Sequence, residues 1–581
     1  MSENKAVELD ISKLPAYADR EFLSDSTDLC EKEQIIDCLD KLLNMTIDSE
    51  ETLEKFVLYR SEFMAAFGQA QSVLYIRMTC QTDDAKRAEA YTKFMSEIVP
   101  VVKTYGDKLD KKYLQAAKEY PLDIERYMVY DRGLRTDVEL FRQENVELQT
   151  QDDMLSQQYQ TISAAMMVTI DDKEYTVQQA AKFLQETDRT LREKAWRATA
   201  KRRLEDAEKL DEVFDKMLQI RGKIAKNAGF DNFRDYQFKN YHRFDYKPED
   251  CKQFHSAVKQ VVVPVLEKIY DRRRTDMKLD ALRPWDTAVD QLGREPLKPF
   301  EKVEELIEGV HKMFEGVDTE LAGQFRKMKD LGLLDLESRK GKAPGGYQST
   351  LTEARLPFIF ANAVGVNYDL ITLLHEGGHA FHAFACAADP LVSYRHAPME
   401  FCEVASMSME LMSMPYLDAF YNDEDAKRSK ASLLKRTVAT LPSVAAIDKF
   451  QHWMYENDAP TGEQRAAMWK QIDDEYMSAA IDYSGLENEQ AFGWHRILHI
   501  FQVPFYYMEY AIAQLGAMQV WCAAKKDQAK AVADYRKALA LGGSRPLPEL
   551  FEAAGIKFDF TAETIGPLME EVVAELEALE N

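Results

Sequence analysis

Long stretches of apolar residues at three- and four-residue spacing constrain the fold of this chain more than any other feature. Residues 176–230 show this spacing among dense Lys, Arg and Glu with few Gly or Pro, and residues 30–120, 425–480 and 561–579 repeat it. The spacing places apolar side chains along one face of an α-helix, which must then pack against a core. The chain is therefore expected to be mainly helical.

Strand-like sequence is rare and local. The apolar run 356–361 follows a glycine-rich loop, and a β-hairpin is expected around the turn Asp171–Asp172. The Pro- and Gly-containing stretch 283–299 predicts a long loop or linker. We therefore expect a little sheet near residues 340–370 within a mainly α protein.

The charge balance excludes several classes of partner. The 581 residues include 74 Lys and Arg against 99 Asp and Glu, which gives a net charge of −25. Binding to nucleic acids and to anionic membranes depends mainly on basic residues, so neither partner is expected. The length is sufficient for more than one core.

The start of the sequence and the cysteines favour a cytoplasmic location. Residues 1–8 have neither a basic nor an apolar region of the kind that signal peptides contain. No apolar run approaches the ~20 residues of a membrane span. The seven cysteines are odd in number, scattered and without a C-x-x-C pair, which is typical of a protein in a reducing compartment.

Histidines gather in one region and contain a metal-binding pattern. Seven of the ten histidines lie within 375–499, and five residues there read His375-Glu376-Gly377-Gly378-His379. On a helix, residues four apart lie ~40° apart around the axis, so both imidazoles can reach one zinc ion. The intervening glutamate, Glu376, is then placed to deprotonate a zinc-bound water molecule.

The surroundings of this pattern favour a metal site over two unrelated surface histidines. Apolar residues flank the pattern on both sides, where unpaired polar side chains would be costly to bury. Gly377 and Gly378 each cost a helix ~1 kcal/mol relative to Ala. Two glycines together indicate close approach of another group, such as a substrate or a strand.

A catalytic zinc ion requires a third protein ligand and one open position. The metzincin pattern would place a third His six residues after His379, where the chain has Ala385 instead, so that class is excluded. Glu400, Glu403 and Glu410 are the alternatives on a following helix. Glu403 and Glu410 are seven residues apart and share a helix face, so one can bind the metal while the other orients a histidine.

The motif His375-Glu-Gly-Gly-His-Ala-Phe-His382, followed by Phe401-Cys-Glu-Val-Ala-Ser406 and Glu410, resembles the M3 family of zinc metallopeptidases. The oligoendopeptidase F branch of that family is the most similar. Further similar pieces lie across residues 170–570, among them Arg221-Gly-Lys-Ile-Ala-Lys-Asn-Ala-Gly-Phe230. The resemblance implies that Glu403 is the third zinc ligand and that Glu410 contacts a ligand rather than the metal itself.

The resemblance also implies an architecture. The family has a neurolysin-like zincin fold, in which two helical halves flank a deep channel that admits short peptides and a small β-sheet lies beside the metal-binding helix. We accordingly expect residues 1–170 to form a helical wall or lid and residues 171–581 to form the catalytic region. One zinc ion per chain is expected.

Peptide hydrolysis also requires donors for the developing oxyanion. The segment 494–510 carries two histidines and several tyrosines. By similarity to the family, His499, Tyr507 and Tyr510 are expected to contact the carbonyl of the bond to be cleaved, with His495 as the competing imidazole. A strand around Phe358–Phe360 could offer an unpaired edge to which an extended peptide adds by main-chain hydrogen bonds.

These observations predict a zinc-dependent endopeptidase that hydrolyses short oligopeptides. An exopeptidase on the same scaffold is the nearest alternative, and it would require a cationic or amide anchor for a terminal carboxylate. A non-catalytic zinc- or peptide-binding protein is a further alternative, as is a purely helical interaction protein. Structural zinc is usually held by four protein ligands, often thiolates, whereas the sequence offers three that are not thiolates.

Overall fold

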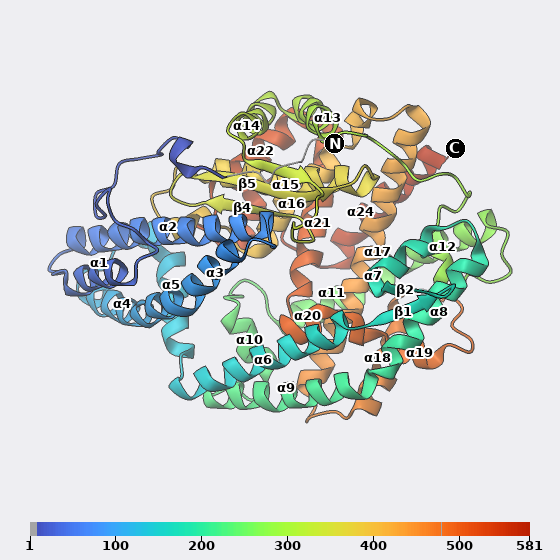
Figure 1. The fold of residues 1–581 in the computed structure, drawn as a ribbon, viewed down its shortest axis with the longest axis horizontal. Coiled ribbons are helices and arrows are strands. Elements are labelled where there is room, and N and C mark those ends of the chain that lie inside the picture. The colour runs from blue at the N-terminus through green and yellow to red at the C-terminus, as the bar shows by residue number, and fades with distance from the viewer. Residues whose placement is uncertain (1–8, 478, 581) are drawn as a thin grey trace. The chain divides into compact units, whose positions relative to one another are not determined.

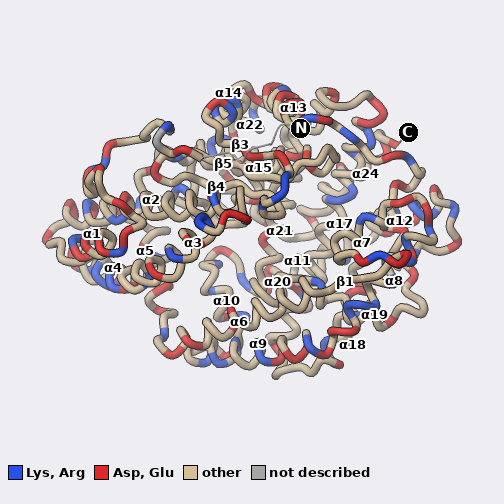
Figure 2. The backbone as a smooth tube through the Cα atoms, viewed as in Figure 1, with Lys and Arg blue, Asp and Glu red and all other residues tan. Residues whose placement is uncertain are grey.

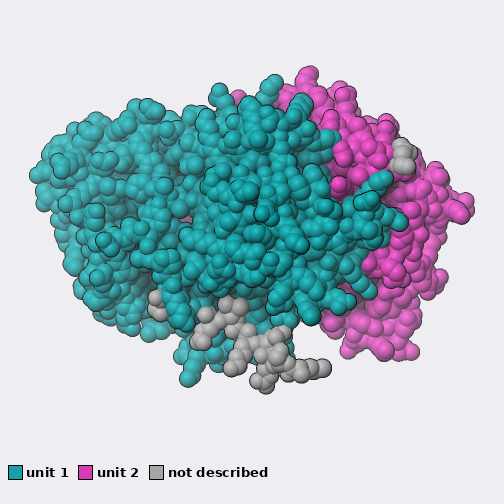
Figure 3. All heavy atoms as spheres, turned by 90° about the horizontal axis from the view of Figure 1, so that it is seen from above, with its two compact units in different colours: residues 1–139, 297–429, 513–558 teal, residues 140–296, 430–512, 559–581 magenta. Residues whose placement is uncertain are grey.

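The computed structural model describes residues 9–477 and 479–580. The chain forms two compact units, each assembled from three segments and coloured separately in Figure 3. Unit 1 comprises residues 1–139, 297–429 and 513–558, and unit 2 comprises residues 140–296, 430–512 and 559–581. The expected loop 283–299 contains the passage of the chain from unit 2 to unit 1. The predicted division by role at residue 170 stays a prediction.

Helices make up most of unit 1, together with a three-stranded sheet (Figure 1). Its elements are η1 (Ile11–Lys13), α1 (Lys32–Asn44), α2 (Glu50–Cys80), α3 (Ala85–Lys93), η2 (Phe94–Ile98), α4 (Val99–Glu119), α5 (Ile124–Leu140), α13 (Val303–Val317), α14 (Thr319–Asp330), β3 (Leu334–Glu337), β4 (Tyr347–Leu351), β5 (Leu356–Ala363), α15 (Asn367–Ala385), η5 (Val392–Arg395), α16 (Met399–Met412), η6 (Met414–Ala419), α22 (Gln528–Ala540) and α23 (Leu547–Ala553).

Unit 2 is also helical and contains a single β-hairpin among its described residues. Its elements are α6 (Gln143–Ala164), β1 (Met167–Ile170), β2 (Lys173–Thr176), α7 (Val177–Ala181), η3 (Lys182–Gln185), α8 (Arg189–Glu205), α9 (Ala207–Asn227), α10 (Phe233–Asn240), α11 (Pro248–Val261), α12 (Val263–Asp276), η4 (Pro284–Asp286), α18 (Gly462–Tyr476), α19 (Glu487–Ala491), η7 (Gly493–Arg496), α20 (Leu498–Gln502) and α24 (Ala562–Glu580). Two long helices, α17 (Asp423–Glu456) and α21 (Tyr507–Lys526), contribute several residues to each unit, and α5 contributes its last residue to unit 2.

The four helical stretches expected from apolar spacing are confirmed, as is the hairpin. Asp171 and Asp172 connect β1 to β2 with φ values of 50° and 60°. Positive φ at both central residues matches the twist of a two-residue hairpin turn, and Asp tolerates that conformation better than most residues do. In the described part of the chain, no helix is long and apolar enough to span a membrane.

The sheet of unit 1 has the order β3-β5-β4. β5 is parallel to β3 and antiparallel to β4, so its main chain is paired on both sides. The prediction that the strand around Phe358–Phe360 offers a free edge is therefore wrong. A central strand buried on both faces reads as a continuous apolar run, which is why it was visible in the sequence. The edge strands are instead β3 and β4, which are both more polar than β5.

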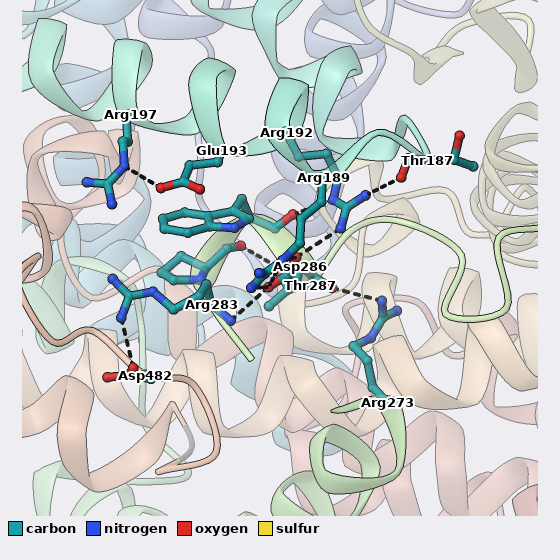
Figure 4. Close-up of polar contacts among 12 residues, drawn as sticks. Thr187, Arg189, Arg192, Glu193, Arg197, Arg273, Arg283, Asp286, Thr287 and Asp482 are labelled. Atoms are coloured by element: carbon teal, nitrogen blue, oxygen red, sulfur yellow. Dashed lines mark hydrogen bonds and ion pairs between the residues drawn. The ribbon is translucent and has the colours of Figure 1, made fainter. Parts of the chain in front are cut away.

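The surface charge is spread along the chain. In Figure 2 acidic and basic positions are interspersed along the chain in both units. One cluster within unit 2 is buried: Asp286, fully shielded from solvent, accepts hydrogen bonds from Arg189 and Arg192 of α8 (Figure 4). The main-chain amide of Arg283 also donates to Asp286, at 3.0 Å. These bonds attach η4, at the start of the long loop, to α8.

Candidate metal centre

Helix α15 carries the His-Glu-Gly-Gly-His pattern and begins at a strongly capped end. The Asp369 carboxylate accepts hydrogen bonds from the main-chain amides of Val364, Gly365 and Val366, at 2.8, 2.9 and 3.0 Å. These amides precede the first turn, where no helical partner is available to them. The cap fixes the point at which the chain leaves β5 and enters α15, which packs on β5 and β4 (Figure 1).

The two glycines of the pattern allow helices to approach closely. A Cβ atom at Gly378 would lie 2.5 Å from Cα of Ser406 and 2.6 Å from the carbonyl oxygen of Ala405, both on α16. At Gly377 it would lie 2.6 Å from the ring of Phe314 on α13. The group that approaches the glycines is thus a neighbouring helix and an aromatic ring, rather than the substrate or strand suggested by the sequence.

Three of the predicted ligands converge at this helix contact. Nε2 of His375 lies 3.4 Å from Oε2 of Glu403, and Nε2 of His379 lies 3.8 Å from the same oxygen. Tetrahedral zinc with bonds of ~2.0–2.1 Å places its ligand atoms ~3.3 Å apart. The two nitrogens and one carboxylate oxygen therefore have the chemistry and the spacing of a zinc site. Glu400 lies outside this group.

Hydrogen bonds hold the first histidine and the glutamate in place. Nδ1 of His375 lies 2.7 Å from Oε1 of Glu410, and the Ser406 hydroxyl donates to Oε2 of Glu403 at 3.0 Å. When Nδ1–H of His375 donates to Glu410, the Nε2 lone pair is left for a metal ion. The structure thus places Glu410 where the sequence predicted a supporting carboxylate.

The electrostatics of the site favour a cation. Burial lowers the pKa of His375, but hydrogen bonds and negative charge from Glu403 and Glu410 outweigh this effect and raise it well above its ordinary value. Carboxylates that stabilise a proton there also stabilise a metal ion. Burial and the neighbouring His375 lower the pKa of His379 to about 4, so its imidazole is neutral and able to bind a metal.

Glu376 has the protonation behaviour of a general base that works near neutral pH. The residue is 7% exposed, and burial raises the pKa of its carboxyl group to about 7. It shares a cavity of about 320 Å³ with His375, His379 and Glu403. A carboxylate whose pKa lies close to the working pH transfers protons efficiently in both directions.

The same cavity is lined by residues that the sequence analysis did not assign to the site. They include Gln348 of β4, the loop residue His396, and Arg395. The main-chain amide of Gln348 contributes to the electrostatic environment of Glu376. The histidine clustering pointed to His396, whereas only the pairing of β4 with β5 reveals Gln348.

The remaining predicted catalytic residues form a cluster within unit 2. The ring of His499 lies against that of Tyr507 at a centroid distance of 4.6 Å and 5.9 Å from that of Tyr510, nearly perpendicular to both. The two tyrosine rings are 5.6 Å apart. The structure brings these three residues together, and their contact with the substrate carbonyl stays a prediction.

Buried polar side chains fix the segment that carries this cluster. Arg221 is fully buried and donates to the carbonyl oxygens of Ile500 and Phe501 at the end of α20. The amide of Phe505, a residue with a φ of 70°, donates to Oε1 of Gln451 at 2.7 Å. Arg243 donates to the Phe505 carbonyl oxygen at 2.7 Å. A left-handed φ at a large residue is costly, so these bonds hold the chain in the turn before α21.

The competing imidazole, His495, is part of the core. It is 3% exposed, and its Nε2 lies 3.3 Å from Oδ1 of Asp211. His499, by contrast, lines a cavity of about 390 Å³ together with Tyr507. Of the two imidazoles, His499 is therefore the one that faces open space.

A second group of possible metal ligands lies within the core of unit 2. It consists of Cys251, Asp448 and His452, all buried. His255 lies 2.8 Å from Oδ2 of Asp448, and His452 lies 3.2 Å from the same oxygen. Burial opposes ionisation of Asp448, but the two imidazoles lower its pKa below the ordinary value. The group resembles a buried ion-pair network, and its three residues line neither the cavity of the first site nor the one beside His499.

Two thirds of the sequence match the model of a known peptidase family. The family model described as "Peptidase family M3" matches residues 182–566, which is more than half of the chain and includes every predicted ligand. The chain belongs to peptidase family M3. The predicted metallopeptidase class and endopeptidase activity are thereby confirmed, and the family implies a metal ion.

Individual relatives support the oligoendopeptidase F branch. The chain is 23% identical over 537 residues to an oligoendopeptidase F homolog of Borreliella burgdorferi, covering 88% of this chain and 86% of that protein. It is 25% identical over 334 residues to the chromosomal oligoendopeptidase F of Lactococcus lactis subsp. cremoris, covering 55% of this chain and 52% of that protein. The solved structure of PZ peptidase A with inhibitor 2 superposes with a TM-score of 0.84 at 27% identity, covering 96% and 99% of the two chains. The predicted branch and the mainly helical fold are confirmed.

Proposed function

We propose that this M3 peptidase is a zinc-dependent oligoendopeptidase that cleaves internal bonds of short peptides. The observation that carries the proposal is the convergence of His375, His379 and Glu403 on one point at zinc-ligand spacing. The names of the oligoendopeptidase F relatives support the substrate class. Zinc, at one ion per chain, is favoured by a donor set of two imidazoles and one carboxylate.

In this proposal each residue of the site has a separate task. Bound zinc would supply Lewis-acid polarisation and a lowered pKa of water. Glu376 accepts the proton of the attacking water and passes it to the departing amine, a shuttle for which a pKa of about 7 is suited. Glu410 keeps the His375 ring oriented through Nδ1. His499, Tyr507 and Tyr510 donate to the oxyanion.

The edge strand β4 is the proposed docking place for the peptide main chain. β4 pairs with β5 on one side only among the described residues, and Gln348 and Thr350 of β4 line the metal cavity. An extended peptide can add to such an edge through its own amides and carbonyls. Because main-chain bonds do not depend on side-chain identity, this mode predicts broad sequence tolerance.

The substitution Glu376→Gln tests the proposal. We expect the zinc content, measured by elemental mass spectrometry, to remain at one ion per chain. The value of kcat/KM should fall by roughly 10²–10⁴-fold, which is the usual contribution of a general base. His379→Ala should lose the zinc ion, and His382→Ala is its matched control, because His382 is on the same helix but outside the ligand group. Full peptidase activity in Glu376→Gln would overturn the assignment.

A further inference from the structure

Two arginines line the cavity that contains His499 and Tyr507. Arg203 comes from α8 and Arg496 from the end of η7, and both border the space of about 390 Å³. Arg203 is partly buried, whereas Arg496 is exposed. All four residues belong to unit 2. The cavity therefore combines two cationic side chains with two of the predicted catalytic groups.

Neither guanidinium has an acidic partner within ion-pair distance in the described ranges 9–477 and 479–580. The neighbouring arginine of α8, Arg202, shows the ordinary arrangement, since it donates to Oδ2 of Asp206 at 2.5 Å. Burial, and then the like charge of Arg496, lower the pKa of Arg203 to about 10. A partly buried cation beside a second cation is unfavourable unless an anion joins them.

One acidic residue, Asp473, is among the described residues that line the cavity. Its Oδ2 accepts a hydrogen bond from Gln490 Nε2 at 2.8 Å, and burial raises its pKa above the ordinary value. Asp473 thus accepts a hydrogen bond from an amide, and the positive charge of Arg496 partly offsets the effect of burial on its pKa, but among the described residues no ion pair joins it to either arginine. The cavity keeps an excess of positive charge next to His499.

We propose that Arg203 and Arg496 form a subsite for a carboxylate of the peptide substrate. The inference rests on the proposed function. The cavity lies beside the bound substrate only if His499 and Tyr507, which line it, contact that substrate as proposed. Guanidinium groups bind carboxylates through paired N–H···O bonds. The carboxylate comes either from the C-terminus of the peptide or from an Asp or Glu side chain. Such a subsite supplies the cationic anchor that the sequence alone did not locate.

The experiment compares matched pairs of quenched fluorescent peptides on the full chain. One pair differs only in a free C-terminal carboxylate against a C-terminal amide, and the other, amidated throughout, differs only in Asp against Asn. The wild type should show a KM roughly tenfold lower for the carboxylate member of one pair, as expected for a charge-assisted hydrogen bond in a partly solvated site. The pair that shows the preference identifies the source of the carboxylate.

The variants Arg203→Met and Arg496→Gln should each abolish most of this preference while leaving cleavage of the amide or Asn peptide within about twofold. Arg202→Met is the matched control, since it removes the same charge from the same helix, and the preference should survive in it. Arg203→Met has no ion pair to lose, so its melting temperature should not fall. This measurement separates loss of the subsite from loss of the fold.

Binding of the same peptide sequences, labelled with the fluorophore but without the quencher, to Glu376→Gln separates the two proposals when it is measured by fluorescence anisotropy. If the wild type cleaves no peptide, the proposed function fails, but tighter binding of the carboxylate member, lost in the additional variant Arg203→Met, still supports the subsite. Equal KM and equal binding within both pairs would overturn the subsite while the peptidase assignment stands. A preference that persists in both arginine variants would overturn it as well.

Discussion

The contact between α15 and α16 at Gly378 gives the sharpest test of how the metal centre is built. Gly378 directly precedes the proposed ligand His379, and an alanine Cβ there would lie 2.5–2.6 Å from main-chain atoms of Ser406 and Ala405. Main-chain atoms of a buried helix cannot rotate away as a side chain can. The substitution Gly378→Ala therefore requires the two helices to separate.

The required movement is large for a metal site. Carbon atoms in ordinary contact are ~3.5–4.0 Å apart, so relief of the clash needs a shift of roughly 1 Å. α15 carries His375 and His379, and α16 carries Glu403, so the shift acts directly on distances that are now 3.4 and 3.8 Å. Metal sites tolerate distance errors of only about 0.2 Å. We expect zinc affinity to fall by at least about tenfold.

Gly378→Ala should lower the stability of the protein, although alanine favours a helix more than glycine does. Alanine in place of a helical glycine gains about 1 kcal/mol, whereas overpacking a core costs about 1–3 kcal/mol, and more where the neighbours are rigid. Gly323→Ala in α14 is the matched control, because a Cβ at Gly323 meets nothing within 4 Å. The control should be as stable as the wild type or more so, with unchanged zinc affinity.

Chelator competition measures the zinc affinity, and thermal unfolding of the zinc-free proteins measures the cost of packing without the metal. If Gly378→Ala binds zinc as tightly as the wild type and melts no earlier than Gly323→Ala, then the glycine does not set the helix spacing. In that case the distance between α15 and α16 would have to be determined by other contacts.

Two further substitutions test the supporting groups. Glu410→Gln should weaken zinc binding by roughly 10–100-fold, because a neutral amide orients the His375 imidazole less well and adds no negative charge; unchanged affinity would show that Glu410 is dispensable. Asp286→Ala should lower the free energy of unfolding of its unit by about 3–5 kcal/mol, because it leaves the buried charge of Arg192 with main-chain carbonyl partners but without its carboxylate. Glu193→Ala is the control, since it removes only a solvent-exposed pair and should cost less than about 1 kcal/mol. Urea denaturation measures the free energy of unfolding of Asp286→Ala and of Glu193→Ala. Equal losses in the two variants would contradict the importance of the buried ion pair.

Local patterns account for the parts of the structure that could be predicted from the sequence. The helical stretches, the hairpin at Asp171–Asp172 and the apolar strand β5 all follow from spacing within a few residues. The pair His375 and His379 is also local, because one helical turn brings the two imidazoles together. Glu403 is 24 residues from His379, so its place at the site could only be inferred from similarity to a family.

Features that depend on pairing between distant segments could not be predicted. β4 and β3 are short and partly polar, and their places on either side of β5 are decided by tertiary packing. The division into units built from separated segments has the same origin. The reason for Gly378 is likewise a tertiary contact, since the sequence shows only that a glycine is present where helix propensity disfavours it.

The histidines show why residue type alone does not assign a role. His255 and His452 share the carboxylate of Asp448, and all three side chains are buried in the core of unit 2. His375 also contacts two carboxylates, but it lines a cavity of about 320 Å³. A carboxylate beside an imidazole raises the affinity of the imidazole for any cation, whether a proton or a metal ion. Such a pair of imidazole and carboxylate can take part in a reaction only where it borders a cavity that a reactant can enter. This condition distinguishes the site on α15 from the network on α11 and α17.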